Sequence, residues 1–150
     1  MSDALFPLMY EYADRAMKLS MAAIQQFRRQ NELSTTQINA LYYLLASPQA
    51  SINSVANHFG FTKAAASQAI DHLVERGLVN RRVDLADRRG KRLCLTDLGQ
   101  EKVAQASEAR RAWLHDLIDG FTPEQQAALQ PAFKILLEGM NKVFTQTNNS

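Results

Sequence analysis

Basic side chains gather in one segment of this sequence, between residues 58 and 92. The segment holds eight Lys and Arg residues against four Asp and Glu residues, so it carries a net charge of +4 in a chain whose total is only +2. Such a local excess is typical of a surface that binds a polyanion. A charged face that meets only solvent has the same composition, so charge alone leaves both interpretations open. The basic residues are Lys63, Arg76, Arg81, Arg82, Arg88, Arg89, Lys91 and Arg92.

The last four of these residues, Arg88, Arg89, Lys91 and Arg92, stand almost side by side in the sequence. At the tip of a hairpin they would repel one another unless an anion met them. A narrow, A·T-rich minor groove of DNA concentrates negative potential and attracts inserted arginine side chains. The spacing therefore predicts contact with a minor groove, and a merely solvated loop is the alternative.

Residues that could support catalysis or bind a metal are scarce. His58, His72 and His115 fall on three different predicted elements without Cys or Asp at metal-ligand spacing, so we expect no metal and no cofactor. A phosphate loop, a nucleophile elbow and paired carboxylates are all missing, so the chain is predicted not to be an enzyme. The single cysteine, Cys94, is either a packed strand residue or a redox sensor activated by nearby arginines.

Amphipathic periodicity predicts long helices at both ends of the chain. The first runs from Leu5 to Gln30, and Ser34-Thr35-Thr36-Gln37 is a capping box for a second helix that ends before Ser47-Pro48. Thr96 is predicted to cap a long helix that continues through Ile118. Thr122-Pro123 then begins the last helix, because Thr favours the N-cap position and Pro the first helical position.

The central part predicts two short helices followed by a hairpin. The first helix begins near Ser51 and ends at Gly60, and Thr62 caps a second helix from Lys63 to about Arg76. The four-residue segment 60–63 between them has helix-turn-helix spacing. Short strands are predicted at 78–83 and 92–95, so the fold class is mainly α with a small β-hairpin.

The terminal helices carry more apolar surface than a small central domain can cover. We therefore predict a homodimer, with an intramolecular helix bundle as the alternative. The sequence lacks a secretory signal pattern and a run of 18 apolar residues, so we expect no membrane association. One cysteine is also in keeping with a reducing cytoplasm, which is the predicted location.

The run from Leu33 to Gly99 resembles the multiple-antibiotic-resistance regulator (MarR) family of bacterial repressors. The resemblance implies a winged helix-turn-helix flanked by long N- and C-terminal dimerisation helices. It assigns residues 33–96 to a DNA-binding lobe and residues 1–32 and 97–150 to a dimerisation region. The matching pieces are residues 33–37, 62–67, 73–79, Arg81-Arg82, Asp87-Arg88-Arg89-Gly90 and residues 93–99.

In that family the second helix of the motif enters the major groove and the hairpin, or wing, reaches a minor groove. Gln68 is able to form two hydrogen bonds with adenine, and the alanine methyl groups are able to contact thymine methyl groups. A Gln68 side chain that only meets solvent is the alternative. The family's Asp-x-Arg pattern, here Asp87 and Arg89, lets the carboxylate orient an arginine, although Arg88 is equally placed to insert. The implied reading positions are Thr62, Lys63, Ala64, Ala65, Ser67, Gln68, Asp71 and His72, and the implied wing positions are Asp87, Arg88, Arg89, Gly90 and Lys91.

Many members of the family also bind small aromatic or lipophilic effectors. Methionine and aromatic residues at helical spacing are candidates for such a pocket, although residues of these types more often belong to a core. The candidates are Met9, Tyr12, Met17, Tyr42, Tyr43 and Trp113.

The sequence therefore predicts a sequence-specific regulator that binds double-stranded DNA as a homodimer on a pseudo-palindromic operator. A ligand-responsive repressor is the expected form. The alternative is a winged-helix protein-interaction module that does not bind DNA.

Overall fold

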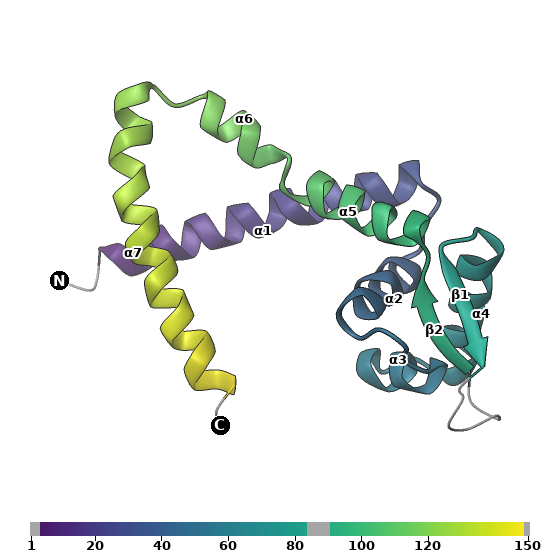
Figure 1. The fold of residues 1–150 in the computed structure, drawn as a ribbon. Coiled ribbons are helices and arrows are strands. Elements are labelled where there is room, and N and C mark those ends of the chain that lie inside the picture. The colour runs from purple at the N-terminus through teal and green to yellow at the C-terminus, as the bar shows by residue number, and fades with distance from the viewer. Residues whose placement is uncertain (1–3, 84–90, 149–150) are drawn as a thin grey trace. The chain divides into compact units, whose positions relative to one another are not determined.

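The structure is a computed structural model that describes residues 4–83 and 91–148 (Figure 1). It is mostly helical with one antiparallel hairpin, which confirms the predicted fold class. The chain forms two compact units, Met1–Arg111 and Ala112–Ser150. The elements are α1 (Leu5–Gln30), α2 (Thr35–Ala46), α3 (Ile52–Phe59), α4 (Lys63–Glu75), β1 (Val79–Val83), β2 (Lys91–Leu95), α5 (Asp97–Arg111), α6 (Trp113–Asp119) and α7 (Pro123–Asn148).

Helix α1 has the bounds that its periodicity predicts, and its end is closed by backbone hydrogen bonds. Glu32 takes a left-handed φ of 51°, and the N–H of Leu33 donates to the carbonyl of Arg28 at 2.9 Å. This bond satisfies one of the carbonyls that a helix leaves unpaired at its C-terminus. Helix α1 packs against α5 within the first unit, where the Lys102 ammonium donates to the Asn31 side-chain oxygen at 2.9 Å.

Local capping sets the ends of the next helices. At α2 the N–H of Gln37 donates to the Ser34 hydroxyl at 3.1 Å and the N–H of Ser34 donates to the Gln37 side-chain oxygen at 2.8 Å, which confirms the predicted capping box. Ser51 caps α3, and Gly60 ends it with a φ of 66°, as predicted. Glycine adopts this left-handed conformation at little energetic cost because it has no Cβ.

The two strands pair in one register. Val79 lies opposite Leu95 and Arg81 lies opposite Leu93, close to the predicted hairpin. The strand β2 also bonds to the loop after α2, because the N–H of Gln49 donates to the Leu93 carbonyl at 3.0 Å and the N–H of Leu93 donates to the Ala50 carbonyl at 2.9 Å. The hairpin is thereby attached to the helical part of the lobe.

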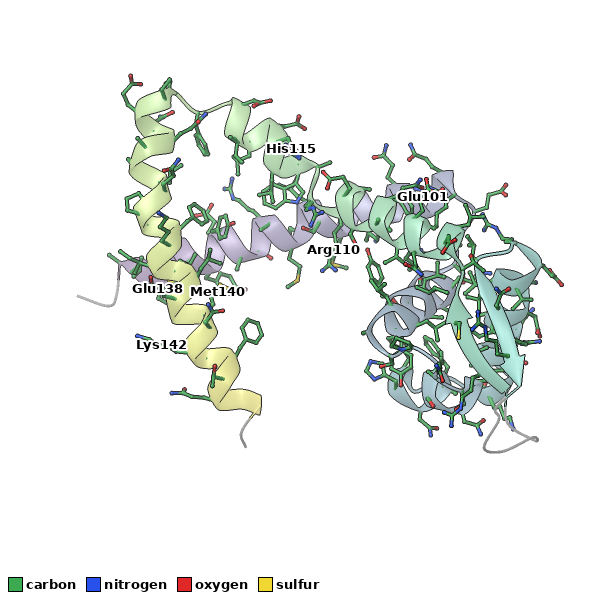
Figure 2. The ribbon with its side chains drawn as sticks, in the orientation of Figure 1. Glu101, Arg110, His115, Glu138, Met140 and Lys142 are labelled. Carbon is green, nitrogen blue, oxygen red and sulfur yellow. The ribbon has the colours of Figure 1, made fainter. Side chains whose placement is uncertain are left out.

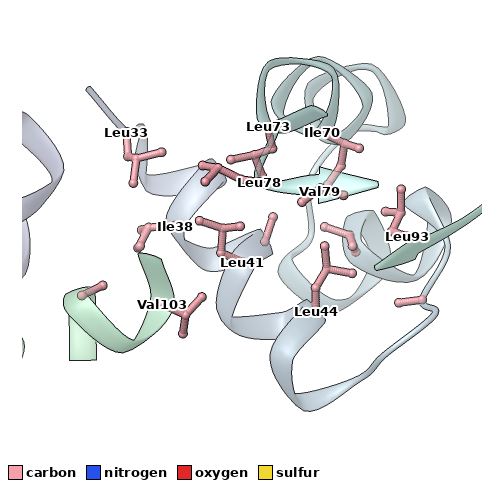
Figure 3. Packing of buried hydrophobic residues seen from close by; sticks show 14 of the residues in the cluster. Leu33, Ile38, Leu41, Leu44, Ile70, Leu73, Leu78, Val79, Leu93 and Val103 are labelled. Carbon is pink, nitrogen blue, oxygen red and sulfur yellow. The ribbon is translucent and has the colours of Figure 1, made fainter. Parts of the chain in front are cut away.

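One hydrophobic core joins the helix-turn-helix to the hairpin. Figure 3 shows Leu41 and Leu44 of α2, Ile70 and Leu73 of α4, and Val103 of α5 gathered in it. Leu41, Ile70 and Leu73 have no exposed surface. Because α2, α4, α5 and the hairpin all contribute side chains to this core, their packing fixes α4 relative to the hairpin.

Helix α5 begins where the sequence predicts but ends earlier. The Thr96 hydroxyl accepts the N–H of Gly99 at 2.9 Å, so the predicted cap is confirmed. The prediction of one helix through Ile118 is wrong, because α5 stops at Arg111 and α6 begins at Trp113. The N–H of His115 donates to the Ala112 carbonyl at 3.0 Å, an i→i−3 bond that tightens the backbone at the break.

The second unit holds α6 and α7. The Thr122 hydroxyl accepts the N–H of Gln125 at 3.3 Å and Pro123 is the first helical residue of α7, as predicted. Pro131 lies inside α7 and has no N–H to donate to the preceding turn. Within the part of the chain that the structure describes, none of the helices is long and apolar enough to cross a membrane.

Candidate nucleic-acid interface

Helix α4 has one face in the core and one face toward solvent. Ala66, Ala69, Ile70 and Leu73 are buried. The remaining positions include every residue that the sequence assigns to DNA reading. Thr62, Lys63, Ala64, Ala65, Gln68 and His72 are exposed, and Ser67 and Asp71 are half-buried.

The start of α4 is fixed by its own cap and by the turn before it. The N–H of Ala65 donates to the Thr62 hydroxyl at 3.1 Å, which confirms Thr62 as the N-cap. The N–H of Phe61 donates to the Ala56 carbonyl at 2.9 Å across the turn from α3. The exposed first turn of α4 carries Lys63, and the positive end of the helix dipole lies there too, so this end of the helix suits a phosphate.

An ion pair joins α4 to the hairpin. The Arg81 guanidinium of β1 donates to the Asp71 carboxylate, 10 residues away in sequence. The Arg81 side chain is 27% exposed and its Nε is buried without a hydrogen-bond partner. Arg81 therefore neutralises the Asp71 carboxylate on the solvent-facing side of α4. Sequence reasoning counted Arg81 in the basic excess but missed this role.

A second link reaches α4 from the start of α2. The Gln37 amide nitrogen lies 3.3 Å from Nδ1 of His72, although the two residues are 35 positions apart. Gln37 is buried whereas His72 is exposed. This contact was also missed, since a helix cap gives no sign in the sequence of its tertiary partner.

The outer face of the hairpin adds two basic residues to the site. Arg82 and Arg92 lie directly opposite each other in the register, and both are exposed. Like charges directly opposite each other disfavour a strand pair. The Arg92 guanidinium also donates to the Gln49 carbonyl at 3.3 Å. The period-2 alternation of strands could have indicated this pair, because it places Arg82 on the face opposite to Arg81.

The predicted wing tip falls outside the described residues. Asp87, Arg88, Arg89 and Gly90 belong to the segment 84–90, so their assignment stays a prediction. Lys91 begins β2 opposite Val83, and its side chain also lies outside the described part.

The candidate effector residues are distributed over both units. Met9, Tyr12 and Met17 are exposed on α1. Tyr42 and Tyr43 are partly buried against the core. The Tyr42 hydroxyl accepts a hydrogen bond from the Ser107 hydroxyl at 3.3 Å. The centre of the Tyr43 ring lies 4.6 Å from that of the His58 ring. Trp113 is half-buried on α6 in the second unit. The proposed pocket therefore stays a prediction.

The histidines and Cys94 lie on separate elements. His58 lies on α3, His72 on α4 and His115 on α6, where Figure 2 labels it. Residues 4–83 and 91–148 hold no group of His, Cys, Asp and Glu side chains arranged for a metal ion. Cys94 is half-buried in β2 opposite Asn80.

The lobe that carries α4 and β1 is similar to known proteins. Residues 32–90 match the MarR family. The HTH-type transcriptional regulator PetP of Rhodobacter capsulatus is 24% identical over 113 residues, which cover 70% of this chain and 68% of PetP.

Solved structures share the fold over nearly the whole chain. The transcriptional regulator Tm0710 of Thermotoga maritima superposes with a TM-score of 0.82 at 18% identity, covering 93% of this chain and 97% of Tm0710. A Staphylococcus aureus MepR variant bound to an oligodeoxyribonucleotide gives a TM-score of 0.71 at 21% identity, covering 89% of this chain and 97% of MepR.

The family match agrees with the prediction that the chain is a regulator rather than an enzyme. The match over residues 32–90, together with the helix-turn-helix and the hairpin, makes this lobe similar to the MarR family.

Proposed function

We propose that this chain is a bacterial, sequence-specific regulator that binds double-stranded DNA in the cytoplasm. The observation that carries the proposal is the exposed face of α4. This face lies next to a hairpin on whose outer face Arg82 and Arg92 stand opposite each other. A helix of this kind fits the major groove, and its exposed polar side chains are the means of reading base edges. The DNA-bound MepR variant, which has a similar fold, supports the same use of the lobe.

The hairpin supplies the second contact in this proposal. Its basic outer face is suited to phosphates, and Arg88 or Arg89 at the tip would enter the minor groove. Because phosphate contacts orient a protein without selecting a sequence, the hairpin would set affinity and register while α4 sets specificity.

The protein would act as a homodimer. Apolar side chains along α1 and α7 support this, because in one chain they remain exposed: Phe6 is 72% exposed and Ile135 is 71% exposed. Figure 2 shows the side chains of both helices, with Met140 labelled on α7. Exposed apolar surface on this scale usually marks an interaction site. Residues 1–32 and 97–150 would then form the dimerisation region, and residues 33–96 the DNA-binding lobe.

A homodimer would bind a pseudo-palindromic operator, with its two α4 helices about 34–36 Å apart. Binding at a promoter would repress transcription. A small aromatic or lipophilic effector would release the DNA by changing the spacing of the two lobes, and Met9, Tyr12, Met17, Tyr42, Tyr43 and Trp113 are the candidates to contact it.

The test is a footprint and a binding titration on DNA upstream of the protein's own gene, with scrambled DNA of the same length and composition as the control. Protection of two half-sites one helical turn apart, with tighter binding than to the scrambled DNA, is the expected result. Equal, weak binding to both DNAs would instead favour a protein-interaction module. Sedimentation of the protein without DNA reports the oligomeric state independently.

A further inference from the structure

Gln37 is a buried polar side chain with contacts at both ends of its amide. It is 7% exposed, and among the described residues it is the polar side chain that the core encloses most fully. Its oxygen accepts the backbone N–H of Ser34 at 2.8 Å, and its nitrogen lies 3.3 Å from Nδ1 of His72 on α4. The cap of α2 is thereby connected directly to the helix proposed to read DNA.

The capping box determines which way the amide points. A backbone N–H can only donate, so the atom of Gln37 that faces Ser34 must be the oxygen. The NH₂ group then faces His72, and an amide NH₂ can only donate. Nδ1 of His72 must accept this bond and so carries no proton. A neutral imidazole without a proton on Nδ1 carries it on Nε2.

We propose that Gln37 is a positioning residue that holds His72 as the neutral Nε2–H tautomer, so that α4 offers DNA a hydrogen-bond donor at this position. The inference rests on the proposed function. His72 is exposed and stands four residues after Gln68 and seven after Ala65, which are also exposed, so the three share one face of α4. The partner of Nε2–H would be an acceptor on DNA, either a phosphate oxygen or N7 or O6 of a purine.

The identity of residue 37 supports this role. Glutamate closes a capping box as well as glutamine does, so the cap alone does not require an amide. A carboxylate at this position would present an acceptor to Nδ1 and would favour a proton there. Only the amide combines an acceptor for Ser34 with a donor for His72.

Nitrogen-15 NMR of the histidine rings in the full-length protein tests the tautomer without DNA. The His72 signal, assigned by its loss in His72→Gln, should show an unprotonated Nδ1 and a protonated Nε2 at neutral pH. In Gln37→Glu, which keeps the capping box, the Nδ1 of His72 should become protonated while the thermal unfolding curve stays close to that of the parent. A protonated Nδ1 in the parent, or a His72 signal unchanged in Gln37→Glu, would overturn the inference.

DNA titrations test the use of the donor. His72→Phe should weaken binding about 3- to 10-fold, the value of one hydrogen bond. Gln37→Glu should change affinity as well, although Gln37 is buried, whereas Gln100→Glu, which makes the same charge change on the exposed surface of α5, should not. An equal loss of affinity for all DNA sequences identifies a phosphate as the acceptor. A loss of affinity that depends on one base pair identifies a purine.

The two hypotheses fail differently. Specific binding by the parent, with no effect of His72→Phe or Gln37→Glu, would overturn the role of His72 and leave the proposed function standing. A parent protein that binds no DNA would overturn the proposed function, and the DNA role of His72 with it, whatever the NMR result for the tautomer.

Discussion

At the scale of single residues, the side chains on the solvent-facing side of α4 differ in their contacts with the rest of the protein. Gln68 is exposed, while Asp71 is paired with Arg81 and His72 contacts Gln37. Arg81 and Arg82 are neighbours with different roles, because alternation along β1 turns one toward α4 and leaves the other exposed opposite Arg92.

Gln68 and Arg82 should therefore give different defects. Gln68→Ala should lower affinity by about 1–3 kcal/mol for one preferred base pair and relax specificity there, since a base-edge contact is lost. Arg82→Ala should weaken binding to every sequence and reduce the salt slope by about 1, as expected for a lost phosphate contact. Titrations against a set of single-base operator variants at several salt concentrations measure both effects. Identical behaviour of the two variants would contradict the assignment of reading helix and wing.

Asp71→Ala should affect stability and binding in opposite directions. Loss of the carboxylate leaves the Arg81 guanidinium unpaired and should reduce the free energy of unfolding by about 1 kcal/mol, because the pair is partly exposed. Binding to scrambled DNA should increase, because a negative charge leaves the interface. Urea denaturation measures the free energy of unfolding, and titrations with scrambled DNA measure the affinity. Glu75→Ala, which removes the same charge from an exposed position of α4, should increase binding without the loss of stability.

At the scale of elements, the helix ends that local caps set were predictable, and the contacts between elements were not. The box of Ser34 and Gln37, the cap of Thr62 and the turn at Gly60 act within four residues, so their signals are local. The Asp71–Arg81 and Gln37–His72 contacts depend on packing between distant segments. The break at Ala112 lacks a proline or glycine to mark it, and its i→i−3 bond was therefore not anticipated.

The contact of α5 with the start of the hairpin gives a prediction at this scale. A Cβ at Gly99 would lie 2.0 Å from the carbonyl oxygen of Leu78, a backbone atom that cannot move aside easily. Gly99→Ala should therefore reduce the free energy of unfolding by at least about 1–3 kcal/mol, measured by denaturant titration. Gly139→Ala is the matched control, since a Cβ there meets nothing within 4 Å. Equal stability of the two variants would show that α5 does not approach β1 this closely.

At the scale of the whole molecule, α1 and α7 each carry exposed apolar side chains within a single chain. Leu137 is 56% exposed on α7 within a single chain. If a second copy covers this face, Leu137→Glu should weaken the dimer and shift sedimentation toward the monomer, while the far-UV circular dichroism stays unchanged. Gln130→Glu, an exposed position on the same helix, should have no effect. A parent protein that is monomeric at micromolar concentration would contradict the dimer.

In the proposed function, the exposed face of α4 and the basic hairpin together bind DNA through many phosphate contacts and a few base contacts. The most direct test is fluorescence anisotropy of the full-length protein with its upstream DNA and with scrambled DNA, between about 50 and 200 mM salt. A dimer making about 6–10 phosphate contacts should lose roughly 10³–10⁵ in affinity over that range and should prefer the upstream DNA throughout. Weak binding that changes with neither salt nor sequence would contradict the claim.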